Sequence, residues 1–266
     1  MESIRLPRDF IVTIPLTSPT HPKTFSPERP KIAVCSFGTE NYREMFDLTV
    51  PNKMDYCDRH GYSGSFPLLE TWSPFNKIRL VRELLNRNDA VLWNDLDALF
   101  MNQDFCIEAL LDPTDGQKTL TITRDGYEGV NSGSFLFEKC DEAFAFLDWM
   151  LEVEDEVMAH PDPWREQRLL DNFVDRYPYL CRVLPQRMMN SYLRAEYPVY
   201  LYPWSDYQEG DWILHFAGLP YQRRIELITQ YLPKESLRDR IQKLHDDLQD
   251  GSHSWHDVSK RLEAML

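Results

Sequence analysis

The sequence has a deficit of basic residues. Of its 266 residues, 29 are Lys or Arg and 43 are Asp or Glu, which gives a formal net charge of −14. Nucleic acids and anionic membranes repel a protein of this charge at long range, so we expect neither as a partner. An anionic substrate would need a site at which the local charge is positive.

Long hydrophobic runs and cysteine motifs are also absent. No stretch approaches the ~18 apolar residues of a membrane-spanning helix, and residues 1–10 lack the apolar core of a secretory signal. The five cysteines never occur as Cys-x-x-Cys, and no Asn-x-Ser/Thr acceptor site occurs. These absences favour a soluble, cytoplasmic protein of bacterial or viral type, with reduced cysteines and no anchor.

Apolar residues make up 42% of the chain, enough for a core, and they fall into short runs. The runs predict strands at 32–37, 90–93, 120–123, 134–137, 182–184 and 212–216, with helices at 42–60, 73–88 and 144–151. Strands that alternate with helices predict an α/β fold with a mostly parallel central sheet. We expect an extended, proline-rich arm at 1–30, one domain at 31–220, and helices at 221–266 that pack on it or form a homodimer.

The strand predicted at 90–93 runs directly into two carboxylates, Asp95 and Asp97. Open α/β sheets bind their ligands at the carboxyl ends of strands, and paired carboxylates suit Mg²⁺ or Mn²⁺. His215 lies in the apolar run 212–216, where a histidine is most often part of the core. If that strand ends beside the two aspartates, its imidazole becomes a third ligand, which suits Mn²⁺.

Two further segments offer polar groups. Residues 129–135 form a predicted small-residue turn before a strand, at which a ligand can lie against the main chain and Asn131 can bind hydroxyl groups. Glu166 and Gln167 stand beside an apolar helical face. Taken singly, these segments also fit an ordinary tight turn and the solvated start of a helix.

The order of these segments is more specific than any one of them. Asp95-Leu96-Asp97, Asn131-Ser132-Gly133-Ser134-Phe135, Glu166-Gln167 and His215-Phe216-Ala217-Gly218 follow one another along the chain, after an Asn-Lys-x-x-Tyr segment at 52–62 and Trp72 with Lys77. This series resembles a family of galactosyltransferases and xylosyltransferases that includes yeast mannan α-galactosyl- and α-mannosyltransferases and plant xyloglucan xylosyltransferases. The resemblance covers residues 31–218.

The resemblance implies a GT-A fold at 31–220, a nucleotide-sugar donor, most simply a UDP-sugar, a glycan acceptor, and transfer of a hexose or pentose with retention of configuration. It also implies Mn²⁺, or Mg²⁺ in its place. Carried over by position, the metal ligands are Asp95, Asp97 and His215. The catalytic residues are Gln167, Asn131 and Glu166, and the donor-binding residues are Ser36, Gly38, Thr39, Lys77, Asp95, Asn131, Ser132, Gly133 and Gly218.

Three alternatives stay open. A related retaining family, with lipopolysaccharide galactosyltransferases and glycogenin, shares Asp-x-Asp, Asn-x-Gly and a terminal His-x-x-Gly. Phosphatases of the haloacid dehalogenase type also place Asp-x-Asp after a strand, although usually after the first strand, whereas Asp95 lies far into the chain. The third alternative is a non-catalytic module that binds nucleotides or carbohydrates.

Overall fold

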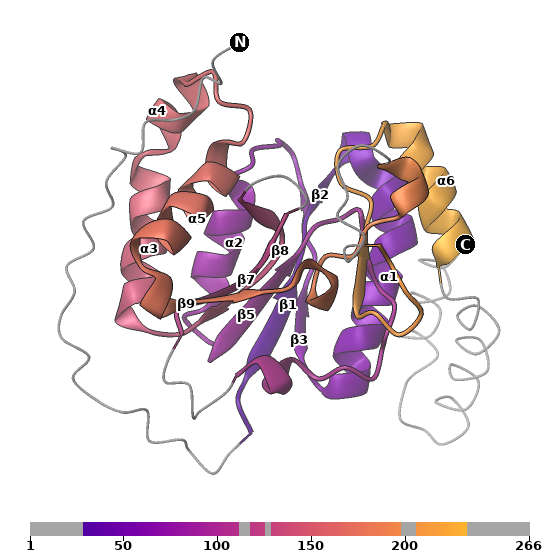
Figure 1. Cartoon of the computed structure of the whole chain (residues 1–266), viewed down its shortest axis with the longest axis horizontal. Helices are drawn as coiled ribbons and strands as arrows, with labels where there is room; N and C mark the ends of the chain where they lie inside the picture. Colours follow the sequence, from indigo (N-terminus) through magenta and orange to yellow (C-terminus); the bar gives the residue numbers. More distant parts are fainter. Residues whose placement is uncertain (1–28, 112–117, 126–128, 198–205, 233–266) are drawn as a thin grey trace.

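The structure is a computed structural model that describes residues 29–111, 118–125, 129–197 and 206–232. Within these residues, helices lie on both sides of a central sheet (Figure 1). The strands are β1 (Ile32–Cys35), β2 (Gly38–Thr39), β3 (Ser63–Ser65), β4 (Leu68–Leu69), β5 (Ala90–Asn94), β6 (Ala98–Phe100), β7 (Leu120–Arg124), β8 (Val130–Glu138), β9 (Cys181–Leu184) and β10 (Ile213–His215). The α-helices are α1 (Arg43–His60), α2 (Asn76–Leu84), α3 (Asp141–Glu152), α4 (Glu154–Ala159), α5 (Arg165–Arg176) and α6 (Tyr221–Tyr231).

The central sheet has six strands in the order β3-β1-β5-β8-β7-β9. β1 is parallel to β3 and β5, and β7 is parallel to β9, whereas β8 is antiparallel to both of its neighbours. The predicted α/β fold with a mostly parallel sheet is therefore confirmed. Because β8 runs in the opposite direction, its first residues lie at the edge where β1 and β5 end, and Ser134 pairs with Asn94.

Side chains that alternate along the strands supply two apolar layers. Val91 and Trp93 of β5 pack toward the cluster that contains α2, α3 and α5, while Leu92 packs toward the layer beside α1. Figure 1 shows the same division, with α2, α3 and α5 on one face of the sheet and α1 and α6 on the other. A strand covered on both faces is apolar throughout, which explains the continuous runs in the sequence.

The predicted helix at 42–60 agrees with α1, which Gly61 ends in the left-handed conformation, with φ of 68°. The expectation of a turn at 129–135 is wrong, because most of that segment belongs to β8. Small residues can form an extended strand as readily as a turn. The irregularity lies instead in the pairing with β7: Thr123 pairs with Asn131, but Ile122 pairs with Phe135, so the residues between them bulge outward.

Part of the expected architecture lies outside the described residues. The arm at 1–30 is described only at its end, and the C-terminal segment only to residue 232. Helix α6, the described part of that segment, packs on the domain through Ile225 and Ile228, which share a cluster with Leu214. Pairing of the C-terminal helices with a second copy stays a prediction. Among the helices that are described, none combines the length and apolar character needed to cross a bilayer.

Candidate active site

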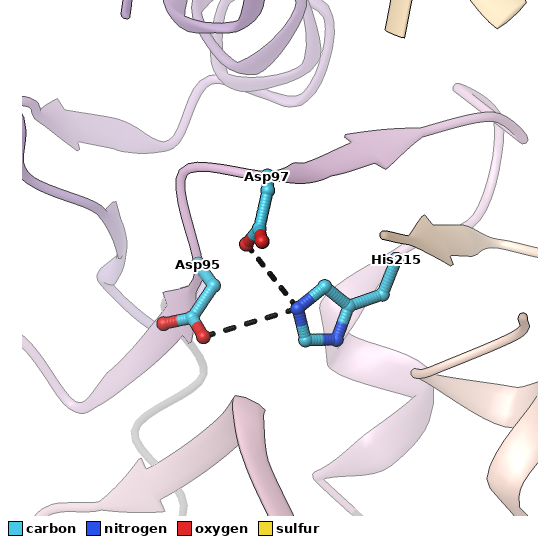
Figure 2. A group of neighbouring side chains, drawn as sticks. All are labelled: Asp95, Asp97 and His215. Atoms are coloured by element: carbon cyan, nitrogen blue, oxygen red, sulfur yellow. Dashed lines mark ion pairs between the residues drawn. The ribbon is translucent and has the colours of Figure 1, made fainter. Parts of the chain in front are cut away.

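Asp95, Asp97 and His215 converge at one point (Figure 2). The His215 Nε2 atom lies 3.3 Å from Oδ1 of Asp97 and 3.9 Å from Oδ2 of Asp95. His215 and Asp97 are buried, at 2% and 7% exposure. The predicted meeting of His215 with two aspartates far from it in the chain is thus observed.

Backbone pairing explains this convergence. Strand β5 ends at Asn94, and the Asp95 N–H continues its pairing with β8 by one residue, donating to the carbonyl of Gly133 at 2.7 Å. A turn follows, closed by the Ala98 N–H to the Asp95 carbonyl at 3.1 Å. Strand β6 then pairs antiparallel with β10, with Ala98 opposite His215. That register brings the imidazole beside the two carboxylates.

The three side chains fit a single divalent cation. Ligands ~2.0–2.2 Å from one Mn²⁺ or Mg²⁺ ion lie ~3 Å apart when adjacent and ~4.4 Å apart when opposite. The two distances from His215 Nε2 fall inside this range. Two carboxylates and one imidazole form a donor set that Mn²⁺ accepts readily. The candidate cation site is therefore Asp95, Asp97 and His215, and their role as ligands stays a prediction.

Arg224 of α6 also contacts this cluster, through an Nη1 that lies 2.8 Å from Oδ2 of Asp97. Burial alone would raise the pKa of Asp97, but His215 and Arg224 hold that pKa well below its ordinary value. Asp97 is consequently ionised at neutral pH, as a carboxylate ligand must be. Oδ2 of Asp97 can bind a cation only if the Arg224 guanidinium moves away or donates to the same oxygen alongside the cation.

Lys77 of α2 lies on the other side of Asp95. Its Nζ is 3.2 Å from Oδ1 of Asp95 and 3.1 Å from Oε1 of Glu166. Burial lowers the pKa of Lys77, but the two carboxylates outweigh burial and raise that pKa above its ordinary value. Asp95 Oδ1 also accepts from the indole N–H of Trp93 at 2.7 Å. These donors leave Oδ2 of Asp95 facing His215.

Lys53 of α1 supports the same turn from behind. It is fully buried, and its Nζ donates to Oδ1 of Asn94 and to the backbone carbonyls of Asp95 and Ala98. Burial lowers its pKa from 10.5 to about 7, although Asp97 and Asp95 oppose that shift. Lys53 thus ties both ends of the turn that carries the two aspartates.

A pocket of about 280 Å³ opens in front of the cluster. One part of its lining follows β1 and β2 and reaches the start of α1: Phe37, Gly38, Thr39, Tyr42 and Met45. A second part lies near α2 and α5: Trp72, Pro74, Lys77, Trp93 and Glu166. The rest surrounds the cluster itself: Asp95, Leu96, Asp97, His215, Ala217, Gly218 and Arg224. Predicted residues from five separate segments therefore share one pocket. Its size suits part of a small polar ligand.

Other predicted residues lie behind this lining. Ser36 is fully buried. Gln167 turns its Oε1 to Ser132, accepting from the backbone N–H at 3.0 Å and from Oγ at 3.2 Å. Gly133 faces His215: a Cβ atom there would lie 2.1 Å from Cε1 of the ring. The small residue at 133 thus makes room for the imidazole.

Two charged groups at this site had no predicted role, Arg224 and Lys53. Arg224 lies in a helix whose pattern pointed only to packing, and Lys53 lies in a segment used only for the family resemblance. The segment around Lys53 is only weakly amphipathic, so no local pattern marked this lysine as buried. Arg223 and Arg224 are the first basic residues after Gly218, but this position alone assigned neither of them a role.

Comparison with known proteins agrees with this geometry. The model of the galactosyl transferase GMA12/MNN10 family matches the chain over residues 31–121 and 113–226. The chain belongs to this family. The predicted resemblance is thereby confirmed.

Two relatives from Schizosaccharomyces pombe illustrate the distance within the family. An uncharacterized α-1,2-galactosyltransferase, C1289.13c, is 25% identical over 215 residues, which cover 64% of this chain and 55% of the relative. The probable α-1,2-galactosyltransferase gmh1 is 25% identical over 235 residues, which cover 71% of this chain and 68% of the relative. The chain thus spans about half to two thirds of the length of these relatives.

A solved structure shares the fold. It is a glycosyltransferase involved in the glycosylation of the major capsid of PBCV-1, with a TM-score of 0.62 and 17% sequence identity, and the match covers 76% of this chain and 100% of that one. The predicted GT-A glycosyltransferase fold is therefore confirmed. At this identity the similarity concerns the fold alone.

Proposed function

We propose that this family member is a metal-dependent, retaining glycosyltransferase that moves a hexose or pentose from a nucleotide-sugar to a glycan acceptor. The convergence of Asp95, Asp97 and His215 on the wall of a polar pocket supports this most directly. The haloacid dehalogenase alternative is less well supported, because Asp95 contacts Lys77 and Trp93 and faces His215. The family match likewise favours transfer over phosphatase chemistry.

The acidic composition requires local positive charge for such a donor. A Mn²⁺ or Mg²⁺ ion held by Asp95, Asp97 and His215 would supply positive charge where a leaving diphosphate gathers negative charge. Lys77 keeps Asp95 and Glu166 close together without repulsion, and it orients Asp95. Arg224 brings a second fixed cation to the pocket.

The donor is expected to enter along the strand ends. Gly38 and Thr39 line the pocket at β2 and would hold the nucleoside, while Gly218 lets a phosphate approach the backbone at a φ of 68°. UDP-galactose is the first donor to test, because the two relatives are named as galactosyltransferases. UDP-glucose, UDP-xylose and GDP-mannose are the next candidates.

The anomeric configuration would be retained if the acceptor attacks the anomeric carbon from the same face that the diphosphate leaves. Gln167, Asn131 and Glu166 are the predicted groups at the anomeric centre. Of these, Glu166 lines the pocket, whereas Gln167 and Asn131 lie behind its lining. Ser132 fixes the Gln167 side chain through Oε1. A Gln167→Ala protein that keeps its full transfer rate would remove Gln167 from this role.

The decisive experiment measures nucleoside diphosphate release by the full chain from this panel of donors, with Mn²⁺, with Mg²⁺ and with chelator. We expect turnover only with metal, and a loss of about 10²–10³-fold in Asp97→Asn. Asp104→Asn is the matched control, because the carboxylate of Asp104 is exposed and forms an ion pair with Arg59. Undiminished turnover in chelator would overturn the proposal.

Two other outcomes identify the alternatives. Phosphate release from aryl phosphates would point to a phosphatase. Nucleotide binding without turnover of any donor would point to a binding module. NMR analysis of the product's anomeric configuration separates retention from inversion.

A further inference from the structure

A chain of buried polar side chains leads away from His215 on the side opposite the carboxylates. The His215 Nδ1 atom lies 2.6 Å from Oδ1 of Asn190, and the Asn190 amide nitrogen lies 3.2 Å from the Tyr192 hydroxyl. Tyr192 in turn contacts Asn131 and Asp125. All five side chains are at most 9% exposed.

The direction of each hydrogen bond in this chain is set at its far end. A carboxylate only accepts, so the Tyr192 hydroxyl donates its single hydrogen to Oδ1 of Asp125, at 3.3 Å. The Tyr192 oxygen is then left to accept. It accepts from the amide nitrogens of Asn131, at 2.9 Å, and Asn190, at 3.2 Å.

A second anchor fixes Asn131. The backbone N–H of Gly133 can only donate, and it donates to Oδ1 of Asn131 at 2.7 Å. The Asn131 amide nitrogen therefore points toward Tyr192 and toward Oδ2 of Asp125, which accepts from it at 3.0 Å. One acceptor-only group and one donor-only group thus determine the orientation of everything between them.

The consequence reaches the candidate cation site. Since the Asn190 amide nitrogen faces Tyr192, its oxygen faces His215 and requires the imidazole hydrogen to be on Nδ1. In the neutral imidazole, Nε2 then presents a lone pair to Asp95 and Asp97, which is the form in which imidazole binds a metal. The two carboxylates and Nε2 can therefore be brought together by a proton on Nε2 or by a metal cation that takes its place.

Backbone structure places Asn190 for this task. Ser191 forms a parallel bridge with Leu214; its N–H donates to the Ile213 carbonyl at 3.0 Å, and the His215 N–H donates to its carbonyl at 2.9 Å. Asn190 and Tyr192 therefore flank β10 in fixed register. This is a built arrangement between chain segments that are far apart in sequence.

We propose that Asn190 is a positioning residue that fixes the tautomer and the orientation of His215, and that Tyr192 and Asp125 set the direction of the Asn190 amide. The inference rests on the proposed function for the identity of the cation. It adds that the cation ligand and Asn131, a predicted sugar-site residue, belong to one hydrogen-bonded unit.

The test measures Mn²⁺ binding to the full chain without any nucleotide sugar, from the electron paramagnetic resonance signal of free Mn²⁺. Asn190→Leu has a similar volume and cannot accept from Nδ1, and we expect its Mn²⁺ affinity to fall 10–100-fold. Asn190→Asp restores an acceptor for the imidazole N–H and should stay within about fivefold of the unaltered protein, since carboxylates are common partners of metal-bound histidines. The Mn²⁺ affinity of Tyr192→Phe should lie between the affinities of Asn190→Leu and Asn190→Asp.

A spectroscopic measurement separates positioning from general damage. At saturating Mn²⁺, nitrogen modulation of the electron spin echo reports a bound imidazole. We expect this signal to be lost in Asn190→Leu and in His215→Ala, and kept in Asn190→Asp. Asn88→Leu is the matched control: Asn88 is also buried, donates to the Leu84 carbonyl at 2.8 Å, and lies before β5, at the end of that strand opposite to Asp95.

The outcomes are distinct. Unchanged Mn²⁺ affinity and a retained nitrogen signal in folded Asn190→Leu would overturn the positioning role and leave the proposed function intact. Equal losses in Asn88→Leu and Asn190→Leu would also overturn it, because the effect would then reflect stability alone. No Mn²⁺ binding by the unaltered protein would overturn the metal dependence in the proposed function, and this inference with it.

Discussion

Lys77 and Lys53 lie on opposite sides of the turn that carries Asp95 and Asp97, and both are buried. Lys77 faces two carboxylates, whereas Lys53 faces an amide oxygen and two backbone carbonyls. Burial lowers the pKa of both, yet that of Lys77 ends above its ordinary value and that of Lys53 falls to about 7.

Burial alone therefore does not decide whether a lysine keeps its charge. At Lys77, the attraction of two carboxylates more than offsets the free-energy cost of desolvating the ammonium group. At Lys53, the contacting groups are neutral and offset less of that cost. We therefore assign Lys77 to the electrostatics of the pocket and Lys53 to the shape of the turn. Four predictions test this division.

The largest expected effect is on activity, in Lys77→Met. Without the ammonium group, Asp95 and Glu166 repel each other, and Asp95 loses a donor that orients it. We expect kcat/KM to fall about 10²–10³-fold, with a smaller change in the free energy of unfolding. Lys31→Met, at an exposed lysine, is the control. Equal activity of the two variants would contradict the assignment of Lys77.

Lys53→Met should act mainly on stability. Three oxygens would each lose one donor, although the Asp95 carbonyl keeps the Ala98 N–H and the cost of burying the ammonium group disappears. We expect the free energy of unfolding in urea to fall by about 3 kcal/mol. A variant of unchanged stability but lower Mn²⁺ affinity would reverse the roles given to the two lysines.

The pH dependence of stability sharpens the same contrast. The folded-state pKa of Lys53 is about 7 and its ordinary value is 10.5, so between these values the unfolded chain binds more protons than the folded one. Stability from this group therefore rises with pH through that window, by about 2 kcal/mol from pH ~7 to ~9. Urea titrations should show this rise in the unaltered protein, and its loss in Lys53→Met. Parallel pH profiles for the two proteins would contradict it.

The smallest effect concerns Arg224→Met. Because the guanidinium occupies Oδ2 of Asp97, its removal should tighten Mn²⁺ binding in the absence of donor by about threefold to tenfold, or about 1 kcal/mol. Arg223→Met is the matched control, since Arg223 pairs with Glu196 and Glu226. The measurement is a Mn²⁺ titration of all three proteins. Weaker binding in Arg224→Met would show that Arg224 does not compete for the carboxylate.

The sequence was informative where local pattern determines structure. The run Ala90–Trp93 predicted a strand because that strand is covered on both faces, and the helix ending at Gly61 followed from the glycine. The meeting of Asp95 with His215 was predictable only from the ordered motifs, since periodicity carries no information about the pairing of β6 with β10.

Other features depend on tertiary register and left no local signal. The bulge opposite Ile122 arises from the pairing of β7 with β8, so small residues there looked like a turn. Asn190 is an unremarkable polar residue until the bridge of Ser191 with Leu214 sets it beside the imidazole. Lys53 shows its role only when the turn after β5 folds against α1.

Gly133 constrains the site because its lack of a Cβ atom leaves room for the His215 ring. A single methyl group at this position would overlap the His215 ring, at 2.1 Å from Cε1 and 2.7 Å from Nδ1. Residue 133 is therefore expected to tolerate exchange as poorly as the histidine, although it contributes no functional group. In a saturation mutagenesis survey, a glycine would score among the most sensitive positions of the enzyme for purely steric reasons.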